Sequence, residues 1–136
     1  MSGSNARSRT SQGLARLRVV VAALLAVHGV ARAGLGIVDD FGTFLTASGL
    51  PLGTLAAWAV TVYEIAGGLL LALGRWVRPL ASLFCLALLA GIALVHWPAG
   101  WFVVGAGRNG LEYSVLLVAV LAVLAWTDES RAEPEA

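Results

Sequence analysis

The sequence predicts an all-α integral membrane protein, a bundle of four transmembrane helices with both termini on the cytoplasmic side. Of its 136 residues, 59% are hydrophobic and only 12% are charged, and the mean hydropathy is +0.84. Soluble domains are about half apolar and a quarter charged. A chain of this size could not bury so much apolar surface in water. Two further observations, the length of four apolar stretches and the distribution of arginine, support the same fold.

Four apolar stretches come close to the length of about 20 residues that a helix needs to cross a bilayer core of about 30 Å. We expect spans at residues 17–36, 52–73, 79–96 and 111–126, of which the last is the shortest. Pro79 would stand in the first turn of its span, where its missing N–H is tolerated. The expected division of the chain is a polar cytoplasmic tail at 1–13, a four-span domain at 14–126 and an acidic cytoplasmic tail at 127–136.

The arginines indicate the orientation, because cytoplasmic loops are enriched in basic residues. Four arginines, Arg7, Arg9, Arg16 and Arg18, lie before or at the start of the first span, and two more, Arg75 and Arg78, lie between the second and third. The connection after the first span carries Asp39 and Asp40 and no basic residue, and only Arg108 departs from the pattern. This distribution predicts a multi-pass protein of a bacterial-type cytoplasmic membrane.

A secretory signal is the competing interpretation of residues 1–33, with Ala31-Arg32-Ala33 as the cleavage site. Its removal would leave three spans and disturb the charge balance, so we favour the four-span interpretation. In the connection after the first span, Phe41, Phe44 and Leu45 predict a short interfacial helix that ends near Gly49.

Several ionisable residues fall inside the predicted spans, where each costs about 2.5–3.5 kcal/mol on insertion scales. His28 and Arg32 are four residues apart, so they share a helix face. At a rise of 1.5 Å per residue, His28 lies about 16 Å into its span, and Glu64 of the second span also falls near the midplane. We expect a charge-balanced cluster inside the bundle. Its candidate members are His28, Arg32, Tyr63, Glu64, His96, Arg108, Glu112 and Tyr113.

Small residues near these groups predict close helix packing. Gly67 and Gly68 follow Glu64 by three and four positions, and Gly91 follows Ala87 by four. Small residues at this spacing let neighbouring helices approach each other. The pattern indicates that Glu64 points into the bundle.

Simpler interpretations of the polar residues remain open at this stage. Glu112 with Asn109 resembles a capping box at the start of the last span. Arg32 could extend to the outer headgroups instead of pairing, and His96 could be a solvated helix end.

Other motifs argue against further kinds of site. Cys85 is the only cysteine and lies in an apolar run, which predicts a buried structural thiol and neither a disulfide nor a metal site. Residues 105–110 match G-x-G-x-x-G, but no strand precedes them, so a tight turn is expected rather than a nucleotide site. The net charge of +1 predicts no nucleic-acid partner.

The order of the polar motifs from Leu17 to Trp126 resembles the DoxX family of small four-span membrane proteins. The motifs are Leu17-Arg18, His28-Gly29 with Arg32, Gly49-Leu50-Pro51, Glu64-x-x-Gly67-Gly68, Arg78, His96, Gly100-Trp101-Phe102 and Gly110-x-Glu112-Tyr113. Two features depart from the family: a lysine is common where Arg32 stands, and this chain ends in TDESRAEPEA instead of a glycine-rich stretch.

The resemblance implies a redox-associated membrane subunit, because the family name comes from a subunit linked to quinone-dependent respiration and thiosulfate oxidation. The first hypothesis is an accessory or quinone-associated subunit of a membrane oxidoreductase. Such a subunit would carry no cofactor within the chain, with quinone as the candidate ligand. It would act with soluble or membrane redox proteins. The alternatives are a non-catalytic scaffold or assembly factor and a small proton or solute transporter, although no inverted repeat supports transport. The lipid bilayer is an expected partner under all three hypotheses. A homo-oligomer is also compatible with each of them.

Overall fold

The computed structural model describes residues 2–104 and 109–128, and this part of the chain is entirely helical apart from turns and loops. Its five α-helices are α1 (Ser2–Gly34), α2 (Val38–Ala47), α3 (Gly53–Ala72), α4 (Val77–Gly91) and α5 (Glu112–Trp126). A π-helical turn, Ile92–His96, and a 3₁₀ turn, Trp97–Ala99, extend α4. The short helix predicted between the first two spans is present as α2.

Within the described residues, three helical stretches are long and apolar enough to cross a membrane. They are Asn5–Gly34, Gly53–Ala72 and Val77–Ala99. The fourth predicted span corresponds to α5, which has 15 residues and is therefore about 22 Å long. The chain is thus an integral membrane protein with several apolar helices.

The polar N-terminal segment is helical in the structure. α1 already begins at Ser2, well before the predicted start of the first span at residue 17. Extending an existing helix by one residue avoids the cost of nucleation. The apolar span therefore serves as a nucleus, and the alanine, arginine and glutamine residues before it are compatible with helix.

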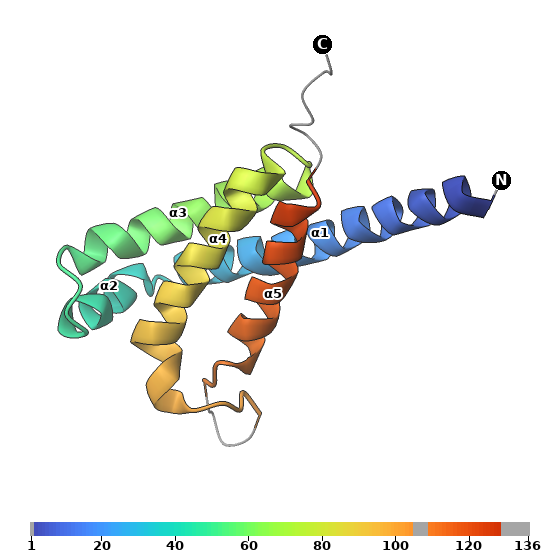
Figure 1. The fold of residues 1–136 in the computed structure, drawn as a ribbon. Coiled ribbons are helices and arrows are strands. Elements are labelled where there is room, and N and C mark those ends of the chain that lie inside the picture. Colours follow the sequence, from blue (N-terminus) through green and yellow to red (C-terminus); the bar gives the residue numbers. More distant parts are fainter. Residues whose placement is uncertain (1, 105–108, 129–136) are drawn as a thin grey trace, which may run out of the picture.

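The helices form two pairs that cross each other (Figure 1). α1 and α3 run in opposite directions and pack most extensively, with α2 against α3 at the end far from the N-terminus. α4 and α5 form the second pair, which meets the first through smaller α1–α5 and α3–α4 contacts. The end of the α4–α5 pair at which α5 begins extends beyond α1 and α3 in Figure 1.

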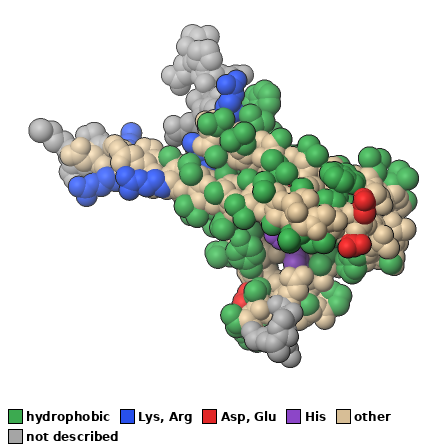
Figure 2. Space-filling model, turned by 180° about the vertical axis from the view of Figure 1, so that it is seen from behind, with side chains coloured by type: hydrophobic (Ala, Val, Ile, Leu, Met, Phe, Trp, Pro, Cys, Tyr) green, Lys and Arg blue, Asp and Glu red, His purple; other side chains and the backbone are tan. Residues whose placement is uncertain are grey.

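The main core lies where the two pairs meet. It consists of Val21, Ala22, Leu25, Leu71, Val77, Ala81, Phe84, Leu117 and Leu121. Many other large apolar side chains lie on the outside, where they cover much of the surface in Figure 2. Such extensive apolar exposure is rare on soluble monomers and fits a surface that faces lipid.

Two glycines permit the close approach of α1 and α3. A Cβ atom at Gly29 would lie 2.9 Å from both the Thr61 carbonyl oxygen and the Glu64 Cβ, and one at Gly68 would lie 3.0 Å from the Ala22 carbonyl oxygen. Gly91 differs from the prediction, because a Cβ there would meet nothing within 4 Å. Gly91 therefore has no close packing partner among the described residues.

Candidate functional site

An ion pair joins the last turn of α1 to the middle of α3. Arg32 Nη1 lies 2.8 Å from Glu64 Oε2, and Arg32 Nη2 lies 3.5 Å from Glu64 Oε1. The two side chains are only 10% and 14% exposed. Such a two-pronged contact between guanidinium and carboxylate fixes orientation as well as charge. Arg32 therefore pairs within the protein and does not extend to the outer headgroups.

Thr61 is a third member of this site, hydrogen-bonded to Arg32. It is not among the residues predicted from the sequence. Its hydroxyl donates to the Ala57 carbonyl oxygen at 2.7 Å and accepts a hydrogen bond from Arg32 Nη1 at 3.0 Å. Thr61 is 1% exposed. The available signal was its position three residues before Glu64, which places it on the same face of α3.

The aromatic ring of Phe41 in α2 covers the guanidinium of Arg32. The Arg32 Cζ atom lies 4.6 Å from the centre of the ring, which is within the range of a cation–π interaction. α2 thus covers one side of the ion pair, and three successive helices contribute to one site.

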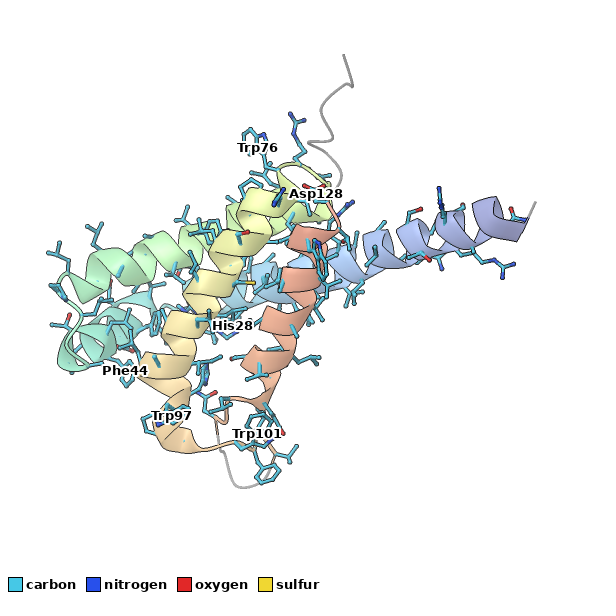
Figure 3. All side chains as sticks on the ribbon, viewed as in Figure 1. His28, Phe44, Trp76, Trp97, Trp101 and Asp128 are labelled. Carbon is cyan, nitrogen blue, oxygen red and sulfur yellow. The ribbon has the colours of Figure 1, made fainter. Side chains whose placement is uncertain are left out.

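His28 lies beside the ion pair but is exposed. It is close enough to Glu64 to interact with it electrostatically. No hydrogen bond joins its ring to another residue of the described ranges 2–104 and 109–128. Figure 3 labels this side chain on α1. His28 is therefore an uncovered hydrogen-bonding group next to a covered ion pair.

A second polar group lies at the far end of the α4–α5 pair. His96 Nδ1 is 2.9 Å from the Asn109 carbonyl oxygen, and Glu112 Oε1 accepts a hydrogen bond of 2.9 Å from the Val103 backbone N–H. These contacts tie Val103 to the start of α5 and Asn109 to the end of the helical extension of α4. α5 begins after Leu111 without a side-chain cap, so the predicted capping box of Asn109 and Glu112 does not form.

The structure thus places the predicted cluster in two separate groups. Arg32, Glu64 and His28 lie together between α1 and α3, whereas His96 and Glu112 lie at the end of α4 and α5. The physical reason is that the second helix pair crosses the first, so the end of that pair at which α5 begins lies away from α1 and α3 (Figure 1). Tyr113 is 43% exposed next to the second group. Arg108 lies outside the described residues.

Tyr63 links α3 to α4, and Cys85 links α4 to α5. The Tyr63 hydroxyl donates to the Leu80 carbonyl oxygen of α4 at 2.8 Å, and its ring packs on Phe84 with centroids 4.3 Å apart. The Cys85 thiol, which is half-buried, contacts the Val118 carbonyl oxygen of α5 at 3.6 Å. No group of three or more His, Cys, Asp or Glu side chains in the described part of the chain could hold a metal ion.

The geometry of the α1–α3 site defines what it can do chemically. The guanidinium of Arg32, itself hydrogen-bonded to Thr61, holds the Glu64 carboxylate in a fixed position. The neighbouring imidazole can donate or accept a hydrogen bond and can carry a proton. The site can therefore bind the polar end of a molecule dissolved in the membrane, or fix the helices around it.

Comparison with known proteins identifies the family. No curated protein and no solved structure matches the chain. The sequence profile of the DoxX family matches residues 13–97, more than half of the chain. This range covers the apolar part of α1 through the helical extension of α4, and it contains the whole Arg32–Glu64 site. The chain belongs to the DoxX family of membrane proteins.

Proposed function

We propose that the chain crosses the cytoplasmic membrane four times with both termini inside. The distribution of charge supports this orientation: the start of α1, the α3–α4 link and the end of α5 lie at one end of the molecule (Figure 1) and carry most of the arginines. Trp76 lies at this end and Trp97 and Trp101 lie at the other (Figure 3), as expected of two interfacial belts.

We further propose that the protein is a quinone-associated subunit of a membrane oxidoreductase, with the quinone headgroup bound at the α1–α3 site. The observation that carries this proposal is the exposed imidazole of His28 beside the almost buried Arg32–Glu64 pair. A polar side chain at membrane depth is costly unless a polar partner covers it. A quinone supplies carbonyl oxygens that accept hydrogen bonds on a ring that dissolves in lipid.

The residues of the site have complementary roles in this proposal. His28 donates a hydrogen bond to a quinone carbonyl, and Glu64 accepts one from the hydroxyl of the reduced quinol. Arg32 and Thr61 keep Glu64 oriented. Electrons pass between the quinone and a partner redox protein, so the chain acts as a non-autonomous subunit.

Quinone retention in nanodiscs tests the proposal. We expect the wild type to retain quinone in excess of empty nanodiscs, and His28→Leu to bind it about tenfold more weakly, the loss expected for a single hydrogen bond of about 1.4 kcal/mol. His96→Leu is the matched control, because His96 belongs to the second polar group and should leave retention unchanged. Equal retention by the wild type, His28→Leu and empty nanodiscs would refute the proposal.

A scaffold function is the second candidate, and a specific observation favours it. Arg32 and Glu64 satisfy each other and Thr61 without any ligand. A scaffold predicts that Arg32→Glu combined with Glu64→Arg restores folding and recovery of partner proteins lost in either single variant. Loss of quinone binding in a well-folded His28→Leu protein would favour the quinone-associated subunit instead.

A further inference from the structure

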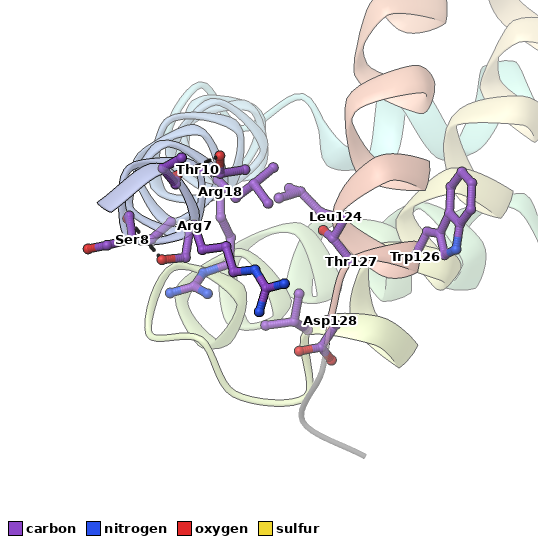
Figure 4. A pocket seen from close by; sticks show the side chains of 13 residues that line it. Arg7, Ser8, Thr10, Arg18, Leu124, Trp126, Thr127 and Asp128 are labelled. Carbon is purple, nitrogen blue, oxygen red and sulfur yellow. Dashed lines mark hydrogen bonds between the residues drawn. The ribbon is translucent and has the colours of Figure 1, made fainter. Parts of the chain in front are cut away.

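A pocket of about 930 Å³ opens at the end of the molecule that carries the N-terminus. One wall is the first part of α1, and the other is formed by the start of α4 and the end of α5. Figure 4 shows Arg7 and Arg18 coming from α1 and Leu124, Thr127 and Asp128 coming from the opposite side. The pocket lies outside the Arg32–Glu64 site and has no role in the function proposed above.

The polar lining of the pocket favours an anion. Arg7 and Arg18 contribute positive charge, and α1 contains no acidic residue over its whole length. The Nε atom of Arg18 is buried and has no hydrogen-bond partner, and the guanidinium lies against Gly74, where a Cβ atom would be 2.8 Å from Nη2. Asp128, the acidic residue of the lining, accepts a hydrogen bond from the Arg78 backbone N–H.

The rest of the lining is apolar and lies at the end of the membrane helices. Leu14 of α1, Val77 of α4 and Leu124 of α5 form this part of the wall. Trp126 is also in the lining and is 87% exposed, as expected of a tryptophan at the membrane interface. A cationic side next to an apolar side, at interfacial depth, matches the phosphate and glycerol regions of a phospholipid.

We propose that this pocket binds the headgroup of an anionic phospholipid of the inner leaflet. The phosphate lies against Arg7 and Arg18, and the glycerol and upper acyl chain lie against Val77 and Leu124. Basic pockets between helices at the cytoplasmic side of membrane proteins are suited to anionic headgroups. The bound lipid joins the extended part of α1 to the α4–α5 pair.

Lipid titration of the full-length protein in mild detergent, followed by native mass spectrometry, tests the proposal. The probes are phosphatidylglycerol, phosphatidylcholine and inorganic phosphate. We expect tight retention of phosphatidylglycerol by the wild type and a loss of roughly fivefold in apparent affinity for Arg7→Gln, and roughly 25-fold for Arg7→Gln with Arg18→Gln.

The matched control removes the same charge from the same helix outside the pocket. Arg9→Gln with Arg16→Gln changes two exposed arginines that do not line it, and this variant should retain phosphatidylglycerol like the wild type. Equal loss in both double variants would show a diffuse charge effect and overturn the proposal. Equal binding of phosphatidylcholine, or full competition by inorganic phosphate, would also overturn it. Because Arg7 lies on the exposed part of α1, its single variant keeps the test valid if Arg18→Gln fails to fold.

Discussion

At the scale of single residues, Arg32 and Glu64 are two opposite charges whose side chains are about nine-tenths buried. Breaking a buried pair by removing one partner is far more costly than removing both. We therefore predict that Glu64→Gln lowers the free energy of unfolding by about 3–5 kcal/mol. The double variant Arg32→Gln with Glu64→Gln should recover part of this loss. Chemical unfolding in mild detergent would measure both, and additive losses would contradict the pairing.

Tyr63 gives a second prediction at this scale. Tyr63→Phe removes the hydrogen bond to the Leu80 carbonyl oxygen and keeps the ring packed on Phe84. The expected cost is about 1 kcal/mol of unfolding free energy. Tyr113→Phe is the control and should leave stability unchanged, since Tyr113 is exposed. An equal effect in both variants would show that the hydroxyl of Tyr63 contributes nothing specific.

The charged members of the α1–α3 site could be predicted from the sequence because unpaired charges are costly in a membrane. Arg32 and Glu64 had to find partners, and helix spacing placed His28 near them. Thr61 could not be predicted in this way, because an uncharged hydroxyl can hydrogen-bond to the backbone of its own helix and needs no distant partner. The local pattern at Asn109 and Glu112 was misleading, because Glu112 accepts a hydrogen bond from Val103.

At the scale of elements, the contact between α1 and α3 depends on glycine. We predict that Gly68→Ala destabilises the protein by about 1–3 kcal/mol, because the added carbon meets the backbone of Ala22 and forces the helices apart. Gly91→Ala is the matched control. Its added carbon meets no atom within 4 Å, and alanine favours helix by about 0.5–1 kcal/mol. Thermal unfolding should therefore rank Gly91→Ala at or above the wild type, and the reverse order would contradict this packing.

The positions of the elements could largely be predicted from hydropathy, because the length of an apolar run is set by the bilayer. The boundaries of α1 could not, since hydropathy reports where a helix can enter lipid and not where it starts. The residues before residue 17 continue the helix, and none of them belongs to the buried hydrophobic core of the protein. Hydropathy also does not distinguish an α-helical turn from a π-helical one. The π-helical turn after Gly91 therefore could not be predicted from the sequence.

At the scale of the whole molecule, the crossing of two helix pairs determines which residues meet. Apolar patterns indicate that helices pack, but they do not give the angle at which the helices cross. In the structure, the α4–α5 pair turns away from α1 and α3, so the described members of the predicted cluster divide into separate groups. The angle between pairs arises from the shapes of side chains in the common core, such as Phe84 and Leu121, which the hydropathy pattern does not contain.

The proposed topology gives the fourth prediction. Single cysteines are introduced at Ser11, Ser48 or Thr127 in a Cys85→Ala background and treated in intact cells with a thiol reagent that cannot cross membranes. We expect labelling of Ser48→Cys alone, with the other two labelled only after the cells are opened. Labelling of Thr127→Cys in intact cells would show that α5, which is about 22 Å long, does not cross the bilayer.

The ion pair also bears on how the protein is made. Arg32, Phe41, Thr61 and Glu64 all belong to the first half of the chain. A nascent polypeptide emerges from its N-terminus, so these groups can neutralise one another before α4 and α5 are synthesised. We expect the α1–α3 hairpin to enter the membrane with Arg32 and Glu64 already paired, and the second hairpin, whose described spans bring no ion pair, to dock on it afterwards.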